Sequence, residues 1–136
     1  MYKTILVAID IGHGDLGKEL LDRAVLLRDE GGRIRLVYVV EDIPGYVLAE
    51  LPAGTVETRR KEGLEHLKAI GKAAGAEVEA EVRGGHAASG IIEAAEDCGA
   101  ELIMLASHRP DFRDYFIGST AARVVRHAQC SVLVAR

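Results

Sequence analysis

The residues best suited to binding an anion lie near the end of the chain. Gly118 and Ser119 open the last predicted helix, and Arg109 lies shortly before them. The first backbone N–H groups of a helix lack partners within the helix, and the helix dipole makes this end positive, so a phosphate fits there. Arg109 could add a bidentate contact to the same phosphate. The alternative is that Ser119 only caps the helix and that Arg109 is solvated.

Asp10 is a second candidate binding residue. It directly follows the apolar run Ile5–Ile9, which predicts a buried central strand. A carboxylate at the end of such a strand lies in the ligand crevice of an α/β protein, where it can accept hydrogen bonds from a ribose or an adenine edge. The alternative is that Asp10 caps the next helix. The residues alone leave both roles open.

A glycine-rich segment after the first predicted strand, Gly12–Gly17, matches the GxGxxG pattern of dinucleotide-binding proteins. Glu41 stands roughly where the ribose-binding acid of such proteins is expected. Against NAD, Asp10 and Asp15 would face a pyrophosphate, and no second dinucleotide-binding half follows. A flexible strand-to-helix turn is the simpler explanation, because six-residue matches are common in glycine-rich chains.

Metal and catalytic sites are not predicted. The five histidines show no HExxH or paired-ligand spacing. His127 and Cys130 straddle the end of a helix, and such a lone pair is usually structural. Ser107 and His108 are adjacent at a strand end, so their side chains point apart and cannot form a triad.

The elements that would position these residues alternate along the chain. Apolar residues at three- or four-residue spacing predict four long helices between the strands. The apolar face of the last helix is predicted to carry Ala121, Val124, Val125 and Ala128. A fifth strand, residues 77–83, alternates apolar and charged residues, which indicates an edge with one face in water. Four runs are almost wholly apolar, as strands covered on both faces should be, and they lie at Ile5–Ile9, Ile34–Val40, Leu102–Ala106 and Ser131–Ala135.

Strict alternation of strand and helix predicts an α/β fold, a doubly wound five-stranded parallel sheet with helices on both faces. The charged strand at one edge and the apolar last strand at the other favour the order 3-2-1-4-5. Ligands of such sheets bind at the carboxyl ends of the strands, here Asp10 and residues 39–42, 83–86 and 106–109. Residues 41–58, with two prolines and two glycines, predict a partly helical flap.

Length and composition restrict the class of protein. A chain of 136 residues predicts a single domain, residues 1–136, with a core of Val, Ile, Leu and Ala, because Trp is absent and aromatic residues make up only 4%. A net charge of −4 offers no attractive field to nucleic acid.

The apolar run near the N-terminus is too short for a signal peptide or a membrane span, so we expect a cytoplasmic protein with no membrane partner. Cys98 and Cys130 are predicted to be free thiols.

Three segments together resemble the universal stress protein family across essentially the whole chain. They are the opening Lys3–Asp10, the end of the second predicted strand at Tyr38–Val39, and the tail from Gly118. The tail is the most specific, because its Gly-Ser, then Arg-Val-Val-Arg-His-Ala, then Cys-Ser-Val-Leu-Val is similar to the family's GS…RVLRHAxCxVLVV ending almost residue for residue.

The resemblance implies a stress-response regulatory protein that binds ATP, with magnesium as counter-ion. In ATP-binding members the motif is G-x2-G-x9-G-[ST], and an Asp after strand one and a Val in strand two hold the nucleoside. Ala106 and Arg109 replace the first two motif glycines, in an Ala-Ser-His-Arg-Pro-Asp loop that resembles a particular bacterial branch of the family. The candidate binding residues are Ala8, Asp10, Val39, Ala106, Ser107, His108, Arg109, Gly118, Ser119 and Thr120.

The resemblance also implies a homodimer through the last strand, whose edge would otherwise remain unpaired, with a tetramer as a further assembly. No residue stands out as a base that would activate water, so we expect at most slow ATP hydrolysis. Two alternatives stay open at this point. One is a nucleotide-free dimeric interaction module whose site is closed or takes only a simple anion, and the other is an NAD-binding protein.

Overall fold

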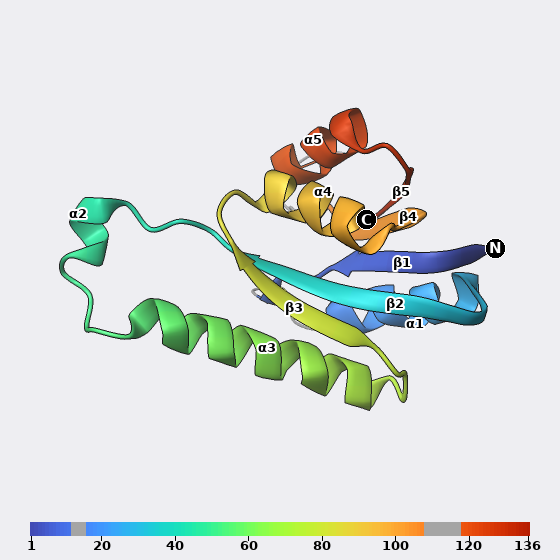
Figure 1. The fold of residues 1–136 in the computed structure, drawn as a ribbon, viewed down its shortest axis with the longest axis horizontal. Helices are drawn as coiled ribbons and strands as arrows, with labels where there is room; N and C mark the ends of the chain where they lie inside the picture. The colour runs from blue at the N-terminus through green and yellow to red at the C-terminus, as the bar shows by residue number, and fades with distance from the viewer. Residues whose placement is uncertain (12–15, 108–117) are drawn as a thin grey trace.

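A computed structural model describes residues 1–11, 16–107 and 118–136 of the chain. Its centre is a five-stranded sheet in the order β3-β2-β1-β4-β5, in which all neighbouring strands run parallel (Figure 1). The predicted fold class and strand order are therefore confirmed. The strands are β1 (Tyr2–Ala8), β2 (Arg28–Val40), β3 (Glu79–Gly84), β4 (Leu102–Ala106) and β5 (Ser131–Ala135).

Helices cover both faces of this sheet, as predicted from the alternation of patterns. One buried apolar cluster joins α1 and α3 to one face, and a second joins α4 and α5 to the other. Within the described residues, no helix is both long and apolar enough to cross a membrane. The helices are α1 (Leu16–Leu27), α2 (Gly45–Leu48), α3 (Thr55–Ala73), α4 (Ala87–Cys98) and α5 (Ser119–His127).

The central strand β1 shows why a strand that is covered on both faces is apolar along its length. Ile5 and Val7 belong to the cluster under α1 and α3, whereas Leu6 belongs to the cluster under α4 and α5, and all three are fully buried. Successive side chains of a strand point to opposite faces, so a strand covered on both sides must be apolar at every position.

Two helices press closely on β2 from opposite sides, and both do so through a glycine. A Cβ atom added at Gly63 of α3 would lie 2.8 Å from Cδ2 of Tyr38, and one added at Gly90 of α4 would lie 2.8 Å from Cγ2 of Val39. These approaches are closer than a side chain permits, so β2 is held firmly between the helices. Val39 lies next to the carboxyl end of β2, so this contact also fixes the position of that strand end.

Three features differ from or refine the sequence-based expectations. Strand β2 begins at Arg28, well before the predicted start at Ile34, and pairs irregularly with β1 between Tyr2 and Thr4. Val125, predicted on the apolar face of the last helix, is 47% exposed. The flap contains the short helix α2, which has no buried residue and projects from the body of the molecule (Figure 1).

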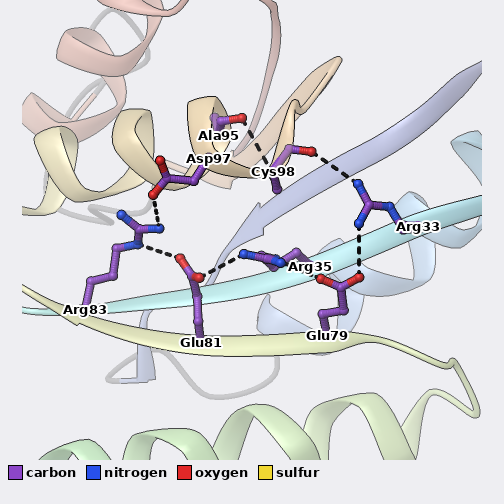
Figure 2. Close-up of polar contacts among 8 residues, drawn as sticks. All are labelled: Arg33, Arg35, Glu79, Glu81, Arg83, Ala95, Asp97 and Cys98. Carbon is purple, nitrogen blue, oxygen red and sulfur yellow. Dashed lines mark hydrogen bonds and ion pairs between the residues drawn. The ribbon is translucent and has the colours of Figure 1, made fainter.

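The face of β3 opposite α3 carries ion pairs instead of apolar side chains. Val78, Ala80 and Val82 pack against the cluster under α3. The alternate residues Glu79, Glu81 and Arg83 point the other way, toward β2 and the end of α4 (Figure 2). This arrangement explains the alternating pattern that predicted an edge strand.

Arg35 of β2 lies at the centre of this ion-pair network. Its Nη2 atom lies 2.6 Å from Oε2 of Glu79, and its Nη1 atom lies 3.0 Å from Oε2 of Glu81. Arg83 joins Glu81 to Asp97 of α4, with Nη2 at 2.6 Å from Oδ2 of Asp97 (Figure 2). Asp97 lies in the last turn of α4, so the network joins β2, β3 and the end of this helix.

Candidate functional site

A cavity of about 520 Å³ opens along the carboxyl ends of the central strands. A crevice at this edge of a parallel sheet is the usual place for a ligand, and this volume falls in the range of small-molecule sites. Eight predicted site residues of the described chain line it: Ala8, Asp10, Val39, Ala106, Ser107, Gly118, Ser119 and Thr120.

The N-terminus of α5 lines one end of this cavity. Gly118 is the N-cap residue, and its N–H group donates a hydrogen bond of 2.7 Å to the Ser107 side-chain oxygen. Among residues 1–11, 16–107 and 118–136, no side chain caps the amides of the first turn. Ser119, Thr120 and Ala121 line the cavity, and the first N–H groups of a helix have no partner within the helix and are suited to an anion.

The Ser107–Gly118 hydrogen bond also joins the residue that follows β4 to the N-cap residue of α5. Ser107 is positioned by its own N–H group, which donates to the carbonyl of Ala135 at 2.8 Å. One short chain of hydrogen bonds thus links the end of β5, the end of β4 and the start of α5. Ser119 is the first residue of α5 and not its N-cap, so the simple capping role considered for it does not apply.

Asp10 lies at the cavity immediately beyond β1. The preceding residue, Ile9, is buried, and its N–H group donates to the carbonyl of Val37 at 2.9 Å, which extends the pairing of β1 with β2. Asp10 itself is exposed and lines the cavity next to Val39. The carboxylate is thus placed beside the β2 end, where the nucleoside was expected.

Two of the candidate residues, His108 and Arg109, lie outside the described residues. The contact of Arg109 with a phosphate remains a prediction. Most of the GxGxxG segment, residues 12–15, also falls outside the described part. Its last glycine, Gly17, packs in α1 so closely that an added Cβ atom would lie 3.1 Å from Cδ1 of Ile70. Helix packing accounts for this glycine.

The cavity also contains two charged residues that were not among the candidate binding residues. Glu41 follows β2, and Arg59 lies in the second turn of α3. Glu41 had been considered only as a ribose-binding acid for NAD. No signal in the sequence marked Arg59, because it is one of several charged residues on an exposed helical surface and only the packing of α3 brings it to the strand ends.

The two cysteines lie away from the cavity and are free thiols, as predicted. Burial raises the pKa of the Cys98 and Cys130 thiols, so both are protonated at neutral pH. Their side chains belong to the partly buried margin of the cluster under α4 and α5. Both side chains therefore contribute to the packing of that cluster.

Comparisons with known proteins agree with this geometry. The model of the universal stress protein family matches residues 1–136. Universal stress protein G from Escherichia coli O157:H7 is 29% identical over 147 residues, with 100% of both chains covered. The solved structure of hypothetical protein MJ0577 shares the fold with a TM-score of 0.81 at 21% identity, covering 99% of this chain and 96% of that one.

Two further solved structures with the same fold are described with a ligand. A universal stress protein in complex with cAMP has a TM-score of 0.68 at 21% identity and covers 99% of this chain and 97% of its own. The universal stress protein from Archaeoglobus fulgidus in complex with dAMP has a TM-score of 0.70 at 21% identity, with coverages of 99% and 98%. By the family model that spans it, this chain belongs to the universal stress protein family.

Proposed function

We propose that this universal stress protein binds an adenine nucleotide, ATP with magnesium as counter-ion, in the cavity at the carboxyl ends of β1, β2 and β4. The observation that carries the proposal is the start of α5, where Ser119, Thr120 and Ala121, whose N–H groups have no partner within the helix, line a cavity of about 520 Å³. Backbone amides at a helix N-terminus bind phosphate oxygens well, because the donors are fixed and the helix dipole favours negative charge.

The same cavity supplies groups for the rest of a nucleotide. Asp10 can accept hydrogen bonds from a ribose or a base, and Val39 provides an apolar wall beside it. Two proteins with this fold are described in complexes with cAMP and dAMP, both of which are adenine nucleotides. These ligands make an adenine nucleotide the ligand class to test first.

The proposed role is regulatory and not catalytic. Within the described residues, the cavity holds no histidine or cysteine, and Asp10 is assigned to the nucleoside. We propose that the protein acts in the cytoplasm as a homodimer joined through β5, and that Arg109 adds a phosphate contact. Binding would then change the state of the dimer surface, and any hydrolysis of ATP would be slow.

Replacing Ser119 by proline tests the α5 amides directly. Ser119 is the first residue of the helix, where proline is tolerated, and Gly118 already has the extended conformation, φ −56° and ψ 154°, that a residue before proline prefers. Ser119→Pro therefore removes one N–H donor with little change to the helix. Ser119→Ala is the matched control, because it removes the hydroxyl group and keeps the N–H group.

Calorimetric titration with ATP and with adenosine gives the readout. Ser119→Pro should weaken ATP binding by about tenfold, the size of one hydrogen bond to a charged group, and leave adenosine binding unchanged. Ser119→Ala should bind both ligands nearly as the wild type does. If the wild type binds neither ligand, the proposed function is wrong and the nucleotide-free interaction module becomes the better description.

A further inference from the structure

At the end of the cavity away from α5, a donor and an acceptor have no partner among the described residues. Arg59 of α3 and Glu41 after β2 line the same cavity. Neither side chain forms a hydrogen bond or an ion pair with any residue of the described chain, and the two do not pair with each other. Opposite charges that share a cavity without meeting leave space for a polar group between them.

The strand order places these two residues at the far end from the phosphate position. Helix α5 starts beside β4 and β5, whereas Glu41 extends β2, on the other side of β1. The beginning of α3 crosses the same region, because the guanidinium of Arg60, next to Arg59, lies directly over Gly84 at the end of β3. A nucleotide with its phosphates at α5 therefore brings its base toward Glu41 and Arg59.

An adenine edge has the pattern of groups that this pair can recognise. In adenine, the acceptor N7 lies beside the donor N6 amino group, whereas hypoxanthine and guanine carry the acceptor O6 at the place of that amino group. A guanidinium offers only donors, and a carboxylate offers only acceptors. A guanidinium and a carboxylate together therefore match the acceptor N7 and the donor N6 amino group of adenine. With hypoxanthine, the carboxylate of Glu41 would face the acceptor O6, and two acceptors form no hydrogen bond.

We propose that Arg59 and Glu41 are base-recognition residues, in which Arg59 donates to a ring nitrogen and Glu41 accepts from the adenine amino group. This inference rests on the proposed function, because it assumes that the phosphates occupy the start of α5. A site that must hydrogen-bond a substrate group rejects an analogue that lacks this group.

Titration of ATP and ITP into four proteins tests the proposal. The wild type should bind ATP at least about tenfold more tightly than ITP, the size of one hydrogen bond to a charged group. Arg59→Met should weaken both nucleotides and keep their ratio, because N7 is present in both bases. Glu41→Gln should reduce the ratio toward one, because a glutamine amide can rotate to donate to O6.

Arg60→Met is the matched control, because Arg60 is the neighbouring arginine of the same helix and does not line the cavity. It removes the same charge and should leave both affinities unchanged. The proposal is overturned if Arg59→Met binds ATP as the wild type does, or if Glu41→Gln leaves the ATP to ITP ratio as it was. If the wild type binds no nucleotide, the proposed function falls and this inference falls with it. Weaker binding of both nucleotides by Arg59→Met and a reduced ATP to ITP ratio in Glu41→Gln, each with wild-type thermal stability, support the assignment.

Discussion

The two edge strands of the sheet are built in opposite ways. At the β3 edge, one face packs on α3 and the other carries the network of Arg33, Arg35, Glu79, Glu81 and Arg83 (Figure 2). At the β5 edge, the side chains in the middle of the strand, Val132, Leu133 and Val134, are all apolar and all half-buried.

The difference shows how the same position in a sheet can be protected or left ready for pairing. Charged side chains on an edge strand oppose pairing with another sheet, because a partner strand would have to desolvate them. An apolar edge strand has no such protection, and its exposed backbone groups are free to pair. The contrast favours the β5 edge as the dimer interface proposed above.

The largest expected effect is on oligomeric state. Replacing Leu133 by lysine puts a charge in the middle of the apolar edge, and we expect the dimer to dissociate into monomers, because burying an unpaired ammonium between two subunits is strongly unfavourable. Sedimentation velocity at micromolar concentration measures this. Val82→Lys is the matched control on β3, where an equally drastic change should lower stability and leave the dimer intact. A wild type that sediments as a monomer would contradict the proposal.

The next effect concerns the covered face of the β3 edge. Leu67 of α3 is fully buried in the cluster that also includes residues of β2. Leu67→Ala should reduce the free energy of unfolding by about 2 to 5 kcal/mol, because the lost apolar contacts leave a cavity that the packed core fills only in part. Urea denaturation gives the value, and a loss well under 1 kcal/mol would show that α3 is loosely attached.

A smaller effect is expected from the charged face of the same edge. Arg35→Met keeps an apolar stem and removes the guanidinium that joins Glu79 to Glu81. We expect a loss of about 1 kcal/mol in urea denaturation, near the upper end for ion pairs that are partly solvent-exposed. Lys18→Met is the control, because it breaks a single exposed pair with Asp22 in α1. It should lower the free energy of unfolding by only a few tenths of a kcal/mol. Equal losses in the two variants would mean that the network adds nothing beyond isolated pairs.

The smallest effect is a pH dependence located at the β3 edge. The hydrogen bond from Arg35 lowers the pKa of Glu79 below its ordinary value of 4.5. A carboxylate with a lowered pKa in the folded state stabilises the fold fully above its unfolded pKa, and this contribution disappears as the pH falls through the folded pKa. The difference in Tm between the wild type and Glu79→Gln should therefore be constant near neutral pH and shrink below about pH 4.5. A difference in Tm that stays the same from neutral pH to below about pH 4.5 would contradict the pairing of an ionised Glu79 with Arg35.

Much of the fold could be predicted from short patterns, and the part that could not depends on contacts across the sheet. The alternation in residues 77–83 was enough to identify β3 as an edge strand, because period-2 polarity requires one face in water. It did not reveal that Glu81 would meet Arg35 and Arg83, since strand register sets these partners. The early start of β2 at Arg28 was also missed, because Asp29, Glu30 and two glycines carry no strand signal.

The candidate site shows the same division. We expected Asp10, Val39 and Gly118 at one edge of the sheet. Asp10 follows a predicted strand, Val39 lies in one, and Gly118 opens a helix, and the carboxyl ends of parallel strands meet at the same edge. Val125 was placed wrongly because its spacing fits the apolar face of α5 while the short helix buries only Ala121 and Val124. Local spacing reports which residues are able to face a core, and packing decides how many of them do.

By itself, the sequence determined the type and order of the strands, the faces of the helices and the edge of the sheet at which the cavity lies, because these follow from periodicities within one segment and from the handedness of crossover connections. Only the tertiary structure decided that Arg59 and Glu41 share a cavity with the start of α5, that Ser107 holds the N–H group of Gly118, and that six charges cover β3. Most of these contacts join residues far apart in the chain. Their geometry depends on register, helix placement and close packing, which no single segment encodes.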